Sequence, residues 1–340
     1  MIGELAGSYR IVSKIAEGGM GVVYRAEHIM IGRPVAVKML LPELSHQREV
    51  VTRFFNEARA ATAVRHPGIV EIFDFGYTPG GQAYIVMELL DGEPVARRLR
   101  RIGQMPEAEA AAIIRTTASA LGAAHTAGII HRDLKPDNLF LCPDPAVPGG
   151  ERPKILDFGI AKLSGPARQG PQMTRADAVL GTPTYMSPEQ CRGAGEVDHR
   201  SDLYSLGCIF YELVSGRPPF TSTAPGVLLA NHLMETPESP RSLVPNLSPA
   251  CEAIILRLLA KRPEERYANA EALGQALDPI LAGPAAWVPP AIPGGAFEQA
   301  PTTVSRPPPW VTPPPMPSTP AVVPASPTTR GPAAGEAAAD

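Results

Sequence analysis

Proline is distributed unevenly along this chain, and its distribution limits where a packed core can form. The last 58 residues, 283–340, contain 16 of the 40 prolines and no leucine, tyrosine or lysine. A segment of this composition buries too little apolar surface to offset the entropy lost on ordering. We therefore expect a folded domain over residues 1–282 and a disordered, proline-rich tail over residues 283–340, with stretches of polyproline II helix.

Both tryptophans of the chain, Trp287 and Trp310, lie in this tail. One interpretation is a docking segment for a partner with an aromatic-lined groove. The other, which proline-rich composition favours, is a linker in which the tryptophans have no special role.

The composition of the whole chain is that of an ordinary protein with one core. Hydrophobic residues make up 44% of it, and the formal net charge is −3, so charge selects neither nucleic acid nor an acidic membrane as partner. The four cysteines are widely spaced, which argues against a disulfide framework or a zinc site. We find no signal peptide and no membrane span, and we expect a cytoplasmic protein. A longer native chain could still carry an anchor or sensor domain.

The folded part changes character near residue 90. Before that point the sequence reads mostly as short β-rich segments, one of them predicted as a strand at 69–74, with one helix predicted at about 49–64. After about residue 106 it reads as helices, at 107–127, 201–215 and 249–260. A β-rich part followed by a helix-rich part predicts an α+β fold with two lobes and a cleft between them.

The segment His131-Arg-Asp-Leu-Lys-Pro-Asp-Asn138 carries the strongest chemical signal. Asp133 is a carboxylate that can accept a proton from a hydroxyl group, and Lys135 is a point charge suited to a phosphoryl group. Asn138 supplies an amide oxygen of the kind that Mg²⁺ binds. These residue types at this spacing predict a catalytic loop rather than an ordinary polar turn.

A second carboxylate follows at Asp157-Phe158-Gly159, directly after a predicted strand. Alone this tripeptide would be interpreted as a turn. Its position after the first motif makes Asp157 a candidate second ligand for Mg²⁺.

Two features of the β-rich part could bind phosphates. Glycines at 18, 19 and 21 would let backbone N–H groups approach them closely. Lys38 lies on an apolar strand, and a lysine turned inward there needs a partner. Glu57 on the predicted helix is the candidate, with Glu49 a looser fit. A plain hairpin and a solvated ion pair are the alternative interpretations.

Together these segments resemble the protein kinase family, and especially its bacterial, eukaryotic-like serine/threonine members. The segments Gly18–Gly21, Gly181–Gln190 and Arg262–Arg266 add to that resemblance. It implies the bilobal kinase fold, with an N-lobe over about residues 9–88 and a C-lobe over about 89–282. It also implies transfer of the γ-phosphoryl group of ATP to serine or threonine hydroxyls of proteins.

The resemblance further implies roles for individual residues. Asp133 would be the catalytic base and Lys135 would contact the γ-phosphate, while Asn138 and Asp157 would hold Mg²⁺, with Mn²⁺ as a substitute. Lys38 would contact the α- and β-phosphates and pair with Glu57. Met87 would be the gatekeeper, and Glu88 to Leu90 would be the hinge that binds adenine through its backbone. The residues expected to line the ATP pocket are Ile15, Ala16, Glu17, Gly18, Gly19, Met20, Gly21, Val22, Val23, Ala36, Lys38, Glu57, Met87, Glu88 and Leu90.

Other positions would have structural or regulatory roles by the same resemblance. Phe158 would stack with His131, Glu189 would pair with Arg266, and Asp202 would anchor the catalytic loop. An arginine at position 132 implies activation by a phosphate on the activation segment. The candidate phosphosites are Thr174 first and Ser164 second, and Thr182 is expected to be structural.

The chain departs from the family pattern in three places. Ala16 replaces the first glycine of the lid over ATP, Ser187 replaces the alanine of Ala-Pro-Glu, and residues 143–153 form a longer loop, which we interpret as a surface insertion. Two other functions stay open. One is a pseudokinase scaffold, although no catalytic residue type is lost, and the other is an interaction protein acting through its tail.

Overall fold

The structure is a computed structural model that describes residues 1–147, 149–158, 183–193 and 197–282. The chain divides into two units, Met1–Trp287 and Val288–Asp340. The second unit and the whole of the predicted proline-rich tail, 283–340, lie outside the described residues.

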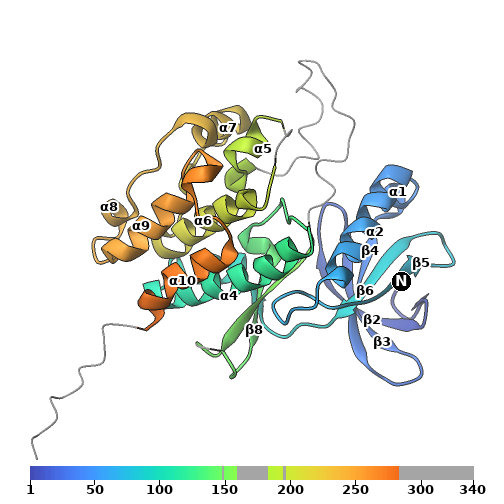
Figure 1. Cartoon of the computed structure of the whole chain (residues 1–340). Helices are drawn as coiled ribbons and strands as arrows, with labels where there is room; N and C mark the ends of the chain where they lie inside the picture. Colours follow the sequence, from blue (N-terminus) through green and yellow to red (C-terminus); the bar gives the residue numbers. More distant parts are fainter. Residues whose placement is uncertain (148, 159–182, 194–196, 283–340) are drawn as a thin grey trace, which may run out of the picture. The chain divides into compact units, whose positions relative to one another are not determined.

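The first part of the chain forms one antiparallel sheet with the strand order β1-β2-β3-β4-β6-β5 (Figure 1). Valine, isoleucine and aromatic residues are frequent in its strands, and such side chains pack well on a pleated surface. The strands are β1 (Leu5–Ala6), β2 (Tyr9–Glu17), β3 (Gly21–His28), β4 (Pro34–Leu40), β5 (Ile72–Tyr77) and β6 (Ala83–Glu88).

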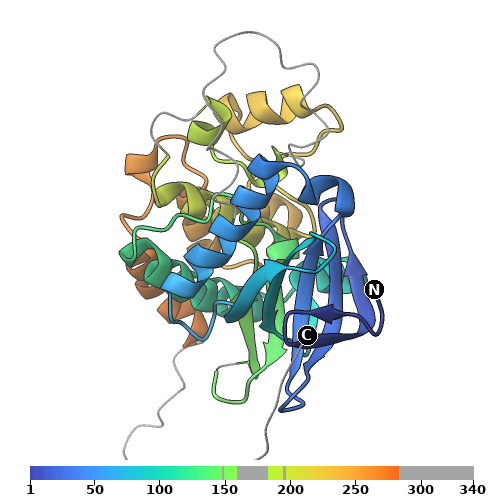
Figure 2. The same ribbon diagram turned by 90° about the vertical axis from the view of Figure 1, so that its right-hand side faces the viewer.

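Helices α1 (Pro42–Ser45) and α2 (Arg48–Ala63) follow β4, and α2 lies beside the sheet (Figures 1 and 2). Phe54 and Phe55 of α2 pack with Ile85 of β6 in one buried cluster. Lys38 is the register partner of Ile85 across β4 and β6. Because opposite residues of an antiparallel pair share a face, Lys38 lies on the face of the sheet that α2 covers.

The second part of the chain is mainly helical and holds the largest buried cluster. Helix α6 is the centre of that cluster, since 13 of its 16 residues are buried. The α4 and α10 helices lie side by side (Figure 1). The helices are α3 (Val95–Ile102), α4 (Glu107–Thr126), α5 (Pro188–Cys191), α6 (Arg200–Ser215), α7 (Pro225–Met234), α8 (Pro240–Leu243), α9 (Pro249–Leu258) and α10 (Ala270–Leu281). The predicted α+β organisation is thus confirmed.

A small second sheet joins β7 (Glu93–Pro94), β8 (Leu139–Pro143) and β9 (Glu151–Ile155). The predicted loop 143–153 is therefore too long, because its last three residues are part of β9. Cross-strand pairing of Pro143 with Glu151 closes the hairpin, and Arg98 of α3 donates a hydrogen bond of 2.8 Å to Glu151.

The prediction of a strand over residues 69–74 is wrong at its start. The strand β5 begins only at Ile72. Ile69 instead forms an isolated parallel bridge with Ile155, and the N–H of Val70 donates to the carbonyl of Ile155 at 3.0 Å. Both Ile69 and Val70 are buried, so their apolar side chains are satisfied by packing against β9.

A buried histidine in the helical part predicts acid sensitivity. His232 of α7 is fully buried, and the hydroxyl of Tyr204 contacts its Nδ1 at 2.9 Å. Burial, aided by the charge of Lys261, lowers the pKa of His232 from 6.5 to about 4, against the opposing effect of the Thr184 and Pro183 backbone. Between these values the unfolded chain binds a proton that the folded chain does not, so the free energy of unfolding falls as the pH falls.

We expect this histidine alone to cost about 2 kcal/mol of stability between pH 7.5 and pH 5. Urea unfolding of the wild type and of His232→Gln at both pH values measures it, because the variant should lose less stability on acidification. His46→Gln, a change at an exposed histidine, is the matched control. Equal acid losses in wild type and His232→Gln would contradict the assignment.

Candidate active site

The loop that carries Asp133 is anchored to helix α6 through one buried carboxylate. Asp202 is fully buried, and its Oδ2 and Oδ1 accept hydrogen bonds of 2.8 Å from the backbone N–H groups of His131 and Arg132. The backbone of Arg132 has a φ of 66°, a conformation that costs a non-glycine residue about 1–3 kcal/mol. Asp202 therefore stabilises a strained backbone directly before the candidate base.

The ring of His131 connects the loop to the segment that carries Asp157. Its Nε2 lies 3.1 Å from the carbonyl oxygen of Leu156, and its Nδ1 lies 3.3 Å from the N–H of Asp133. With the proton on Nε2, the ring donates to Leu156 and accepts from Asp133. The ring also contacts Phe158, with centroids 5.1 Å apart. The two rings, predicted to stack, are thus in contact with their planes tilted by 45°.

The side chains of Asp133, Lys135 and Asn138 lie around one point of this loop. The Nζ of Lys135 is 3.3 Å from Oδ2 of Asp133. The Nδ2 of Asn138 donates to the backbone carbonyl of Asp133 at 2.8 Å. Because this bond occupies the amide nitrogen of Asn138, its Oδ1 is the atom left to act as an acceptor or metal ligand.

The two candidate metal ligands are brought together by the backbone. The N–H of Leu156 donates to the carbonyl of Asn138 at 2.8 Å, so Asp157 follows one residue after a direct link to Asn138. Asp157 has a φ of 37°, a second strained residue at the site. A carboxylate and an amide oxygen fit the preference of Mg²⁺ for few protein ligands, the remainder coming from water and phosphate.

Lys38 and Asp157 form an ion pair across the site. Nζ of Lys38 lies 2.6 Å from Oδ2 of Asp157. Burial alone would lower the pKa of Lys38, but the carboxylate outweighs it and the pKa is raised. Burial would likewise raise the pKa of Asp157, and Lys38 outweighs it, so that pKa is lowered. Both groups are therefore held in their charged forms.

Glu57 lies on α2, one helical turn after Phe54, and its charge also raises the pKa of Lys38. Nζ of Lys38 is 6.0 Å from the centre of the Phe54 ring. Glu57 thus acts on Lys38 through its charge. The ion pair that Lys38 forms at 2.6 Å is with Asp157.

The glycine-rich turn joins β2 to β3, and its glycines have different surroundings. A Cβ at Gly18 or Gly19 would meet no atom within 4 Å, whereas one at Gly21 would overlap the carbonyl of Met39 on β4. Gly21 is therefore required by strand packing, whereas a side chain at Gly18 or Gly19 would have room; the N–H of Gly18 donates to the carbonyl of Gly21 at 2.9 Å, which closes the turn. The other pocket residues predicted on these strands flank the turn, namely Ile15, Ala16, Glu17, Met20, Val22 and Val23.

The predicted hinge lies at the end of β6. Met87 is paired with Ala36 of β4, and Leu90 follows, half-buried. The side chain of Glu88 accepts 2.6 Å from Nζ of Lys154 and 2.9 Å from the N–H of Glu71. Glu88 thus links the hinge to β9, and its side chain serves this contact.

Glu189 of α5 and Arg266 form a buried ion pair with two parallel hydrogen bonds, at 2.8 and 2.9 Å. The hydroxyl of Ser201 donates to the same carboxylate at 2.5 Å. Burial would raise the pKa of Glu189, but the guanidinium outweighs it and the pKa is lowered. This pair fixes the start of α5 against the helical core.

Four predicted positions, Gly159, Ser164, Thr174 and Thr182, lie outside the described residues. Nε of Arg132 is buried and has no hydrogen-bond partner within the part of the chain that the structure describes.

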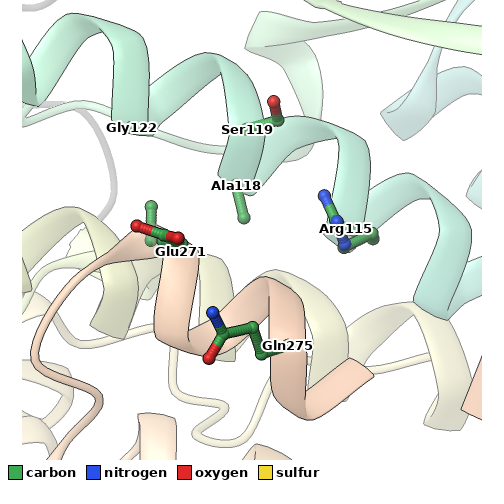
Figure 3. Close-up of a pocket in the computed structure, with 7 residues that line it drawn as sticks. Arg115, Ala118, Ser119, Gly122, Glu271 and Gln275 are labelled. Atoms are coloured by element: carbon green, nitrogen blue, oxygen red, sulfur yellow. The ribbon is translucent and has the colours of Figure 1, made fainter. Parts of the chain in front are cut away.

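A pocket of about 300 Å³ lies between α4 and α10 (Figure 3). Arg115 and Ser119 line it from α4, and Glu271 and Gln275 from α10. None of the candidate site residues is among its lining residues.

Comparison with known proteins decides the family. The protein kinase domain model matches residues 9–277. The chain belongs to the protein kinase family. The kinase domain is 44% identical over 284 residues to serine/threonine-protein kinase Pkn1 of Myxococcus xanthus, covering 83% of this chain and 39% of that protein. It is 40% identical over 270 residues to PknB of Mycobacterium tuberculosis, covering 78% of this chain and 42% of PknB.

The kinase domain also resembles solved structures. The PknI kinase domain of M. tuberculosis matches with a TM-score of 0.64 and 27% identity, covering 82% of this chain and 98% of that one. The predicted kinase fold is therefore confirmed. The chain spans about two-fifths of the length of each of the curated relatives named. Members of the family use ATP with a divalent metal and act on proteins.

Several residues of the kinase domain that hold the site escaped the sequence analysis. His125 contacts Asp202 through Nε2 at 2.8 Å, and nothing local in the sequence connects them. Lys154 precedes the apolar end of β9, and a lysine in such a place needs an acidic partner, which is Glu88. Gln190 lies within the segment that carried the family resemblance, yet no role was assigned to it.

Proposed function

We propose that this chain is an active serine/threonine protein kinase. The proposal rests on one observation, namely that Lys38, Asp133, Asn138 and Asp157 converge through direct contacts. Lys38 pairs with Asp157, Asp157 follows the residue bonded to Asn138, and Asn138 donates to the backbone of Asp133. Similarity to Pkn1 and PknB, which are named serine/threonine kinases, supports the specificity.

In the proposed reaction, the hydroxyl oxygen of a serine or threonine forms a bond to the γ-phosphorus of ATP. The bond between that phosphorus and the β–γ bridging oxygen breaks, and ADP leaves. Asp133 accepts the proton of the hydroxyl group and orients it. Lys135, next to Asp133, stabilises the negative charge on the transferring group.

The remaining residues bind and orient the nucleotide. Lys38, held in its charged form, would contact the α- and β-phosphates, and the glycine-rich turn, which carries no side chain at Gly18 and Gly19, would cover them. The oxygens of Asn138 and Asp157 would hold Mg²⁺, with Mn²⁺ as a substitute. Bound there, the metal would neutralise phosphate charge.

Radiolabel transfer tests the proposal. The purified chain with Mg²⁺, γ-labelled ATP and casein should place label on serine and threonine, and not on tyrosine. Excess EDTA should reduce the transfer to background, and added Mg²⁺ should restore it. Because the pseudokinase alternative predicts no label with the metal present, an unlabelled product would refute the proposed activity.

We also propose a phosphosite, a cellular location and a role for the tail. Autophosphorylation would occur on the activation segment, with Thr174 before Ser164 as the site. The kinase would act in the cytoplasm, where ATP and reduced thiols are available. The proline-rich tail would act as a linker. A docking role for the tail remains the alternative, and binding studies on a chain ending at Leu281 distinguish the two.

Among the helices in the described ranges, none has the length and apolar character needed to cross a bilayer.

A further inference from the structure

The side-chain amide of Gln190 forms hydrogen bonds with two different segments, through its oxygen and through its nitrogen. Its Oε1 accepts a hydrogen bond of 2.9 Å from the N–H of Ser187, and its own N–H donates to Oγ of Ser187 at 3.3 Å. This reciprocal pair is a capping box at the start of α5. A cap of this kind needs only the oxygen of the amide, so a glutamate would serve as well.

The nitrogen of the same amide makes a second contact outside α5. Nε2 of Gln190 donates to the backbone carbonyl of Arg132 at 2.8 Å. Arg132 is the strained residue whose N–H is bound by Asp202. Its two backbone groups are thus held by side chains from two different helices, α5 and α6.

The carbonyl of Arg132 and the N–H of Asp133 belong to one planar peptide group. Gln190 holds the oxygen end of this plane, and Nδ1 of His131 lies 3.3 Å from the nitrogen end. The orientation of the plane sets the direction in which the Asp133 side chain leaves the backbone. Since the backbone at Arg132 is strained, the plane would rotate if one of its two partners were lost.

We propose that Gln190 is a positioning residue for Asp133. It couples the end of the activation segment to the catalytic loop, because α5 is itself fixed by the buried pair of Glu189 and Arg266. When α5 is in place, the amide of Gln190 holds the peptide plane before the base. The inference rests on the proposed kinase activity.

The variant Gln190→Glu separates the two contacts of this side chain. Its carboxylate can still accept from Ser187, but it has no N–H to donate and would face the carbonyl oxygen of Arg132. We expect kcat to fall about tenfold, with KM for ATP within twofold of wild type and a melting temperature lowered less than in Gln190→Met. Gln190→Met, which loses both contacts, should show the same loss of kcat together with a lower melting temperature.

Two further variants serve as controls. Ser187→Ala weakens the cap and leaves the contact with Arg132, so its kcat should stay within twofold of wild type. Gln275→Glu makes the same chemical change at an exposed position on α10, and its kcat should not change.

The measurements are initial rates of casein phosphorylation at varied ATP, and thermal unfolding. A kcat of Gln190→Glu within twofold of wild type would overturn the inference. So would a parallel change of kcat, KM and melting temperature, because that pattern indicates general destabilisation. A wild type without transfer would sink the proposed function and this inference together, whereas an active wild type with an unaltered Gln190→Glu sinks the inference alone.

Discussion

Replacing Asp133 by Asn should lower kcat by roughly two to four orders of magnitude while ATP binding persists. The asparagine keeps the size of the side chain and can still hydrogen-bond to a hydroxyl group, but it cannot accept the proton. Two backbone contacts help to place this residue, through the carbonyl bonded to Asn138 and the N–H near His131, and the oxygen of an asparagine side chain can still accept from Lys135 as the carboxylate does. The substitution therefore removes the chemistry and leaves the loop in place.

Initial rates of transfer to casein measure the loss of turnover, and titration with a fluorescent ATP analogue measures binding. Asp144→Asn, which makes the same change of charge in the loop between β8 and β9, is the control and should keep turnover within about threefold. Turnover of Asp133→Asn within tenfold of wild type would refute the role of Asp133 as the base. Loss of nucleotide binding in the same variant would show instead that the loop had been disrupted.

The catalytic residues could be predicted from sequence because their chemistry needs fixed residue types at short spacing. The catalytic loop places its key residues Asp133, Lys135 and Asn138 within the short segment 133–138. Their mutual contacts in the structure follow from this closeness in sequence. The main helices were predictable for a similar reason, since their apolar residues recur with the helical period.

Contacts between distant segments could not be predicted in the same way. The sequence favoured Glu57 as the partner of Lys38, because it weighed carboxylates on the next helix, and Asp157 was considered only as a metal ligand. The bond of Gln190 to Arg132 depends on a backbone carbonyl, which every residue has and no pattern marks. The start of β5 was predicted at Ile69 instead of Ile72, because burial and membership of a sheet select the same apolar residues.

The second large effect is expected in stability, from Arg266→Met. The Arg266 side chain is fully buried and donates to both oxygens of Glu189 as well as to the carbonyls of Ala260 and Arg200. Methionine fills much of the volume, but it removes the ion-pair partner of a buried carboxylate, which still accepts from Ser201, and it removes the donor to the carbonyls of Ala260, Arg200 and Lys261. Breaking one side of a buried ion pair costs about 3–5 kcal/mol, which corresponds to a fall in melting temperature of about 10 °C for a domain of this size.

The exposed pair of Arg262 with Glu264 provides the matched control, since Arg262 is 70% exposed. Arg262→Met should change the free energy of unfolding by less than about 0.5 kcal/mol. In Arg266→Met, burial without the guanidinium would raise the pKa of Glu189 above that of the unfolded chain, so the folded variant would bind an extra proton. Its deficit relative to wild type should therefore shrink as the pH falls from 8 towards 5. Urea unfolding across that range measures both effects. A deficit below 1 kcal/mol at pH 8, or one that grows on acidification, would show that the Glu189–Arg266 pair does not stabilise the fold in this way.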